Sequence, residues 1–169
     1  MLIKSLQNYG FKGSYENLND AQFETAIIQL KHIFSKYFAA SYVESSFKLP
    51  NDYIEFIKSI TSYLSTGNYH TLYSIDEVVK GTKGFLIDGE HYFLKRKKSN
   101  SPITTDVMWI TIGWWSDKHD LILCCDCSSA YWGKIYDVWD DHPWSGENFT
   151  TAAVYDNIED YVSQLLENE

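Results

Sequence analysis

The longest helical pattern in the sequence lies near its N-terminus. Between Phe23 and Phe38, apolar side chains recur every three or four residues, a spacing that places them on one face of an α-helix. Asn19 stands just before this stripe and Gln22 follows three positions later, so the two residues can cap the helix. We therefore expect one long amphipathic helix here, followed by a polar and irregular segment at 40–48.

Two further helical stripes are predicted. Pro50 fits the first position of a helix, and Gly67 is a stop signal. The apolar side chains on one face between them are Tyr53, Phe56, Ile57, Ile60 and Leu64. Near the C-terminus, Asn157 can cap a last helix with Asp160 at its third position, and apolar residues follow at helical spacing to Leu166. We expect two N-terminal helices and one C-terminal helix.

The hydrophobic period changes after Tyr69. Leu72–Ile75 is predicted to be a short strand and Asp76–Lys80 a single helical turn. The dipeptide Asp88-Gly89 is a strong hairpin signal and predicts a turn between two more strands. These two strands are Phe85–Ile87 and His91–Leu94. An antiparallel meander is expected to begin in this segment.

Three stronger strand candidates follow, at Val107–Trp114, Leu121–Asp126 and Lys134–Trp139. The connections between them are short enough to require antiparallel neighbours. No linker or internal repeat divides the chain. The sequence therefore predicts one α+β domain over residues 1–169, with a mainly antiparallel sheet of about five strands packed by the two N-terminal helices and the C-terminal helix.

The charge balance bears on the kind of partner. The chain has 23 acidic and 14 basic side chains, for a formal net charge of −9. A nucleic-acid binder needs a surplus of cations on one face, so this balance argues against nucleic acid and favours a basic protein partner. Aromatic residues make up 17% of the chain, more than one small core needs. We therefore expect some aromatic surface to face a groove or a partner.

The first residues and the cysteines indicate where the protein works. No signal peptide is recognisable, and the longest apolar stretch, at 107–115, is far shorter than the ~20 residues that a membrane span needs. The three cysteines, Cys124, Cys125 and Cys127, have no distant cysteine to bridge to. A disulfide scaffold is therefore excluded, and a soluble, cytoplasmic protein without membrane contact is expected.

The same cysteines are also a candidate chemical site. Thiolates and imidazoles bind zinc, but Cys124 and Cys125 are neighbours on a predicted strand and point to opposite faces. We interpret them as structural thiols packed in a β core. A catalytic cysteine paired with His119 or His142 remains the alternative.

A second cluster lies at the end of the last predicted strand. Its members are Asp137, Asp140, Asp141 and His142. Such a run can hold a divalent metal, supply an acid and a base, or form an ordinary solvated turn ahead of Pro143. It can also belong to a binding surface, because it lies between Trp139 and Trp144 and aromatic residues beside acids are typical of interfaces.

The wider pattern favours that last interpretation. Acidic residues are concentrated in the sheet half of the chain and alternate there with tryptophans, and Trp114 and Trp115 must point to opposite faces of a strand. We expect a partner-binding surface and no catalytic residue, metal or cofactor. Its candidate residues are Trp114, Trp115, Asp117, Asp120, Trp132, Asp137, Asp140, Asp141 and Trp144.

Several segments resemble one known family. Leu49–Ile57 resembles the helix opening Leu-Pro-x-x-Tyr-x-x-Phe-Leu of the SUKH superfamily, the Smi/Knr-like proteins. Later segments are similar to that family in the same order, namely Leu72–Val78, Ile112–Asp117, Leu121–Asp126, Gly133–Trp139 and the closing helix Ile158–Leu166. The resemblance implies a family-like core at 49–169 and an N-terminal helical extension at 1–48.

The resemblance also implies a function. It suggests a bacterial immunity protein that binds and neutralises a cognate toxin, often a nuclease, whereas eukaryotic relatives act as scaffolds in cell-wall regulation. It brings no catalytic residues. The acidic, aromatic-rich composition independently suits a toxin that is basic because it binds nucleic acid. A carbohydrate-binding module is the alternative from another class, because Trp and Tyr beside carboxylates also stack on sugars.

Overall fold

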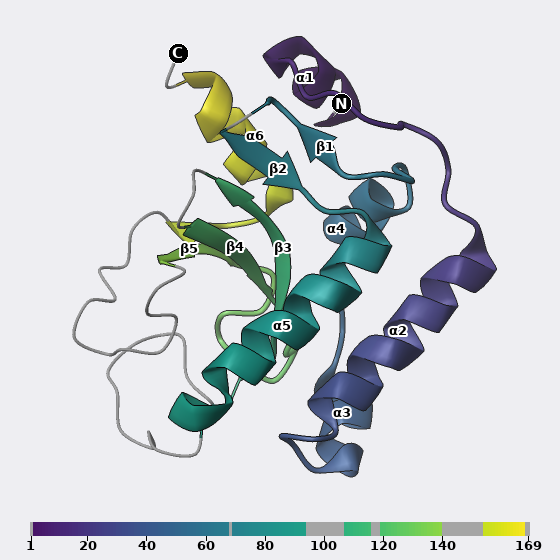
Figure 1. Ribbon diagram of the computed structural model, residues 1–169, viewed down its shortest axis with the longest axis vertical. Coiled ribbons are helices and arrows are strands. Elements are labelled where there is room, and N and C mark those ends of the chain that lie inside the picture. The colour runs from purple at the N-terminus through teal and green to yellow at the C-terminus, as the bar shows by residue number, and fades with distance from the viewer. Residues whose placement is uncertain (1, 68, 94–106, 116–118, 140–153, 168–169) are drawn as a thin grey trace.

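The computed structural model describes residues 2–67, 69–93, 107–115, 119–139 and 154–167 (Figure 1). Within these ranges the chain forms an α+β domain, which confirms the predicted class. The helices are α1 (Leu2–Tyr9), α2 (Asp20–Phe34), α3 (Ala40–Ser46), α4 (Asn51–Ile57), α5 (Ile75–Phe93) and α6 (Ile158–Glu167). The strands are β1 (Leu64–Ser65), β2 (His70–Leu72), β3 (Trp109–Trp115), β4 (His119–Cys124), β5 (Ile135–Trp139) and β6 (Val154–Tyr155).

The strands form one antiparallel sheet in chain order, β1-β2-β3-β4-β5-β6. Its centre is the set of three strands that the sequence predicts most strongly, β3, β4 and β5. The register shifts between Thr111 and Gly113 of β3. A Cβ atom on Gly113 would lie 2.1 Å from the Thr71 carbonyl oxygen of β2, so only glycine fits this crossing point.

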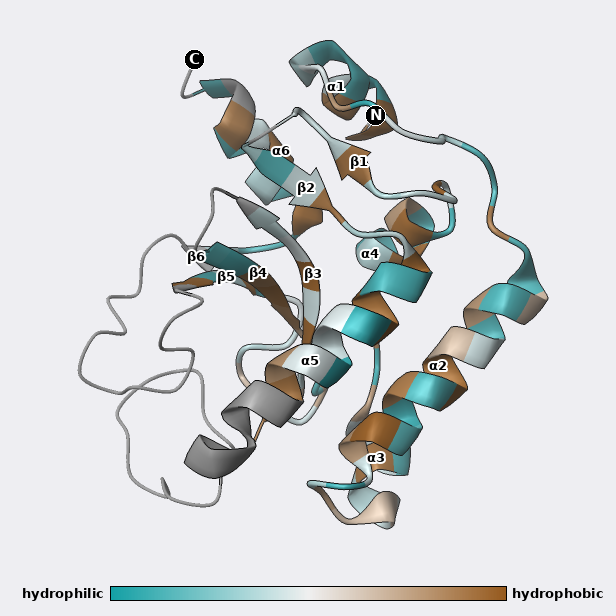
Figure 2. Ribbon diagram, in the orientation of Figure 1, coloured by the Kyte–Doolittle hydropathy of each residue, from teal (hydrophilic) through white to brown (hydrophobic). Residues whose placement is uncertain are grey.

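The main core lies between one face of the sheet and the helices. Alternate residues of β3 and β4, such as Ile110, Ile112, Leu121 and Leu123, join apolar side chains from all six helices there. Figure 2 shows apolar bands along α2 and α5 and apolar stretches on β4 and β5. The opposite face carries a smaller cluster of buried side chains: Phe85, Trp109, Ile122, Cys124, Tyr136 and Val138. The sheet therefore has two unequal apolar faces.

The largest error of the sequence analysis concerns helix α5, where strands were predicted. The predicted strands at Phe85–Ile87 and His91–Leu94, and the Asp88-Gly89 hairpin between them, are wrong, because all of these residues except Leu94 lie in one 19-residue helix. Leu94 itself lies outside the described residues. Buried side chains at Ile75, Val78, Thr82, Phe85 and Leu86 have helical spacing. Packing of this stripe against β3 outweighs the local turn preference of the Asp-Gly pair.

The N-terminal half contains two helices, α1 and α3, that the sequence analysis did not predict. The Asn19 side chain caps α2 as predicted, accepting a hydrogen bond from the Ala21 amide at 2.7 Å. Helix α2 ends at Phe34, and the segment predicted to be irregular contains the short helix α3. Helix α3 buries Val43 in the main core although most of its residues are polar. The sequence did not predict helix α3 because a single buried apolar residue, Val43, produces no periodic pattern.

The remaining helix predictions are partly correct. Pro50 precedes α4 as its N-cap residue, and the helix ends at Ile57, well before the predicted stop. Leu64, which was expected on the same helix face, is instead a buried residue of strand β1. At the C-terminus, the Asn157 side chain accepts a hydrogen bond from the Asp160 amide at 2.9 Å, which confirms the predicted cap of α6.

Candidate functional site

The predicted partner-binding residues fall into three groups. Asp117, Asp140, Asp141 and Trp144 lie outside the described residues, as does His142. Trp115 is the last residue of β3 and is described through its backbone. The structure places the other four, which are Trp114, Asp120, Trp132 and Asp137.

Trp114 and Asp120 come together at one end of the sheet. They are directly opposite each other on β3 and β4, and Thr71 of β2 is opposite Trp114 on the other side. Residues in one such row share a face of the sheet and contact each other across strands. Both Trp114 and Asp120 are half-buried. The row therefore presents an indole and a carboxylate side by side.

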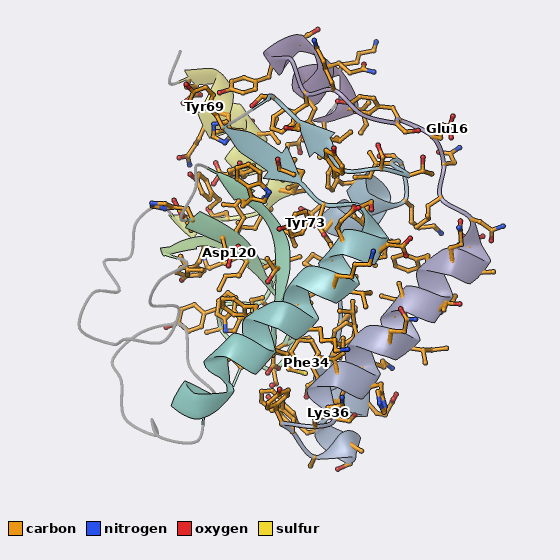
Figure 3. All side chains as sticks on the ribbon, viewed as in Figure 1. Glu16, Phe34, Lys36, Tyr69, Tyr73 and Asp120 are labelled. Atoms are coloured by element: carbon orange, nitrogen blue, oxygen red, sulfur yellow. The ribbon has the colours of Figure 1, made fainter. Side chains whose placement is uncertain are left out.

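A tyrosine that the sequence analysis missed lies beside this row. Tyr69 directly precedes β2, whose first residue, His70, is paired with Trp115 (Figure 3). It is 69% exposed, the largest value among the large hydrophobic side chains that the structure describes. No period or motif marks a single exposed tyrosine in a turn. We call Tyr69, Trp114 and Asp120 the sheet-end patch.

Trp132 lies at the opposite end of the sheet, in the connection between β4 and β5. Its indole N–H donates a 2.8 Å hydrogen bond to the Lys48 carbonyl oxygen, and the Lys48 ammonium lies 5.7 Å from the ring centroid. The side chain is 39% exposed. The structure thus separates Trp132 from the sheet-end patch and fixes the orientation of its ring.

Asp137 is buried on the main-core face of β5. Its Oδ1 lies 2.6 Å from the Nδ1 of His119 on β4, and the two side chains are 4% and 12% exposed. A buried carboxylate needs such a partner because its desolvation is costly. The geometry gives Asp137 a role inside the molecule, beneath the end of the sheet that carries Trp114 and Asp120.

Other titratable groups surround this pair. The Tyr161 hydroxyl of α6 lies 3.4 Å from the Nδ1 of His70, and the rings of Tyr155 and Tyr161 meet edge to face with centroids 5.0 Å apart. Burial lowers the pKa of His70, while the Asp137 carboxylate acts in the opposite direction. Burial also raises the pKa of Tyr161 well above its usual value. This end of the core is therefore polar, and its stability is expected to depend on pH.

The cysteines are placed as the strand alternation predicts. Cys124 belongs to the smaller apolar cluster and Cys125 to the main core, so their thiols lie on opposite faces of the sheet. Burial raises the pKa of Cys124 to about 11, so the thiol is not activated as a nucleophile. His119 lies at the other end of β4, about 17 Å away at the usual rise per residue. The geometry therefore does not support a Cys124–His119 pair.

Asp126 is a second buried carboxylate, and the sequence analysis gave it no role. It is 0% exposed and follows directly on Cys125. Its oxygens accept hydrogen bonds from the Tyr42 hydroxyl at 2.7 Å, the Ser128 hydroxyl at 2.6 Å and the Ser128 amide at 3.1 Å. The Met108 amide lies at 3.4 Å. Asp126 thus joins α3, the residue before β3 and the loop after β4.

Metal-binding clusters and membrane-spanning helices are absent among the described residues. Among them, no group of three or more His, Cys, Asp or Glu side chains is arranged to hold a metal ion. In that same part of the chain, no helix is both long and apolar enough to cross a membrane. What the described site residues offer is a surface of aromatic rings and a carboxylate at the sheet end, stiffened from below by buried polar pairs.

Comparison with known proteins agrees with the family resemblance. Residues 43–164 match the model of the SMI1 / KNR4 family (SUKH-1). No curated protein and no solved structure matches the chain significantly. The family match begins within α3 and ends within α6, so it covers strands β1 to β6, α4 and α5 in full and leaves α1 and α2 outside. Since it spans well over half of the sequence, the chain belongs to the SMI1/KNR4 (SUKH-1) family.

Proposed function

We propose that this protein is an immunity protein that binds and neutralises a cognate basic toxin through the sheet-end patch. Membership of the SUKH superfamily, which includes immunity proteins, supports the class of function. The choice of this docking surface rests on one observation. Half-buried Trp114 and Asp120 lie opposite each other in one row of the sheet, next to exposed Tyr69. The other predicted residues, Trp115, Asp117, Asp140, Asp141 and Trp144, belong to the proposal on sequence grounds alone.

The two kinds of side chain are expected to act on different steps of binding. Carboxylates on a protein of net charge −9 attract a basic partner and raise the association rate at low salt. Aromatic anchors that become buried in the complex slow dissociation, and truncating one typically costs about 2 kcal/mol or more. A nuclease toxin supplies the matching basic surface, because its own substrate is a polyanion.

Binding kinetics with a basic toxin domain from the same genome test the proposal. We expect Trp114→Ala and Tyr69→Ala to raise the dissociation rate constant, and Asp120→Asn to lower the association rate constant and its salt dependence. Tyr63→Ala is the matched control for Tyr69, because Tyr63 is also exposed, at 53%, but precedes β1 at the edge of the sheet.

Two results would contradict the proposal. One is the absence of any complex with the toxin domain at micromolar concentrations. The other is that the Tyr69, Trp114 and Asp120 variants leave both rate constants as the Tyr63 control does. The second result would keep the immunity function and move the docking surface elsewhere on the protein. Asp140→Asn and Asp141→Asn extend the series and are expected to act mainly on association.

Trp132 favours carbohydrate binding as a second candidate function. Its ring is partly exposed and is fixed by the hydrogen bond to Lys48, as expected of a platform on which a sugar stacks. Titration with neutral oligosaccharides, followed by tryptophan fluorescence, tests this alternative. A saturable change that Trp132→Ala abolishes would support it, and a flat titration would exclude it for the sugars used.

A further inference from the structure

A small pocket lies where helices α1, α4 and α6 meet, apart from the sheet-end patch. Its volume is about 220 Å³. Sites for cofactors and drug-sized ligands usually measure about 300–1,000 Å³, so this pocket suits a single side chain better. Its lining residues are Leu2, Ile3, Asp52, Glu55, Phe56, Ser59, Ile158 and Glu159.

The pocket has an apolar floor and an acidic rim. Phe56 and Ile158 are 3% and 1% exposed, so their side chains belong to the core and form the bottom. Asp52 and Glu55 lie on the same face of α4 as Phe56, at helical spacing, and Glu159 follows Ile158 on α6. Two helices therefore direct three carboxylates towards one apolar surface.

These three carboxylates have no side-chain partner among the described residues. The cation that follows α4, Lys58, is turned the other way, towards Asp20 and the ring of Phe23, whose centroid lies 5.4 Å from its Nζ. The described ion pairs involve acidic residues outside the pocket, such as Glu44 and Asp156. The pocket therefore holds negative charge that the described part of the chain does not compensate.

We propose that this pocket receives an arginine side chain from the basic protein partner. A guanidinium group is planar and weakly hydrated, so it can lie on the apolar floor while it donates hydrogen bonds to the carboxylates. A hydrated metal ion gains nothing from Phe56 and Ile158. The partner's identity rests on the proposed function, but the pocket does not, and it adds a second contact that includes α1, a helix outside the family match.

Titration of the full-length protein with acetyl-arginine amide, followed by the amide signals of α4 and α6 in NMR spectra, tests the pocket without any toxin. We expect saturable shifts for residues around Glu55 and Glu159, with millimolar affinity and weakening in high salt. Acetyl-norleucine amide, which has a similar stem without the charge, is expected to give none. Absence of saturation, or equal shifts with both probes, would overturn the proposal.

Charge-neutral variants sharpen the test. Glu55→Gln and Glu159→Gln are each expected to weaken arginine binding by about twofold to fivefold, and the double variant by about tenfold. Glu24→Gln on α2 is the matched control, because it removes the same charge from an exposed position outside the pocket. An equal effect of Glu24→Gln would show that only net charge matters and would refute a specific pocket.

The same variants in complex with the toxin separate the two proposals. If the double variant weakens the complex while Trp114→Ala does not, the pocket holds and the sheet-end patch is not the docking face. If Trp114→Ala weakens the complex and the double variant does not, the pocket is no contact for this partner and the proposal is wrong. If both weaken it, the partner contacts both surfaces.

Discussion

Two buried aspartates illustrate two ways of placing a negative charge in this core. Asp126, two residues after β4, accepts hydrogen bonds from neutral donors, chiefly Tyr42 and Ser128. Asp137, on β5, is paired with the imidazole of His119 near the other end of the sheet. The first carboxylate is a fixed joint between segments. The second lies near His70 beneath the sheet-end patch, and burial lowers the pKa of His70, so solution pH can act at that end of the core.

Replacing Asp126 by Ala is expected to have the largest effect on stability. The change removes the carboxylate that accepts hydrogen bonds from the Tyr42 and Ser128 hydroxyls, and it opens a void at a position that is 0% exposed. We expect a loss of about 3 kcal/mol or more in the free energy of unfolding, measured with urea. Asp156→Ala, which breaks an exposed ion pair with Lys134, is the control and is expected to cost well under about 1 kcal/mol. Similar losses for both variants would refute the role of Asp126.

Replacing Asp137 by Asn is expected to cost less, about 2 kcal/mol, because the amide keeps one acceptor oxygen close to His119. A double-mutant cycle with His119→Ala measures the interaction directly. We expect a coupling free energy of about 1 kcal/mol or more in urea unfolding. Additive effects of the two changes would mean that the 2.6 Å contact contributes nothing to stability.

Replacing Tyr42 by Phe tests a single donor of the Asp126 network. Only one hydroxyl is lost, and Asp126 keeps its hydrogen bonds from Ser128. We expect a loss of about 1 kcal/mol in the free energy of unfolding, measured with urea. A loss as large as that of Asp126→Ala would mean that the Tyr42 hydroxyl, and not the carboxylate, holds the network together.

The smallest expected effect is a pH dependence that originates at His70. Burial lowers the pKa of this imidazole from its ordinary value of 6.5, so the unfolded chain binds a proton more readily than the folded one. The groups that face it are Tyr9, Tyr161 and Asp137. The contribution of His70 to the free energy of unfolding is therefore fully present above pH 6.5. It decreases as the pH falls towards the lower pKa of His70 in the folded state.

Thermal unfolding at a series of pH values measures this effect. His70→Asn removes the titrating group and is expected to lose less stability than the wild type between pH 7 and pH 5. His32→Asn, at an exposed position on α2, is the control and should follow the wild-type curve. Parallel curves for wild type and His70→Asn would show that acid acts at other groups.

The parts of the fold that the sequence predicted correctly depend on local signals. The apolar strands β3, β4 and β5 and the asparagine caps of α2 and α6 are set by neighbours within a few residues. Helix α5 was missed because its glycines and the Asp88-Gly89 pair favour a turn locally. Its helical stripe is stabilised by contact with β3, a strand more than twenty residues further along the chain.

The candidate site shows the same difference between features set by local patterns and features set by contacts between distant residues. Alternation along a strand correctly placed Cys124 and Cys125 on opposite faces of the sheet. It could not show that Asp137 meets His119, because that contact depends on the register between β4 and β5. Tyr69 was missed since an exposed ring in a turn follows no period.

The strand β2 is so short that it leaves part of the β3 edge without a strand partner among the described residues. It pairs with β3 only at residues 113–115, and below them the Thr111 amide donates a 3.0 Å hydrogen bond to the Thr82 hydroxyl of α5. An open strand edge is a template on which other copies of a chain can assemble into aggregates. The Thr82 side chain, which is 0% exposed, closes this edge with a helix in place of a strand. We therefore expect the resistance of the protein to aggregation in concentrated solution to depend in part on this buried hydroxyl group.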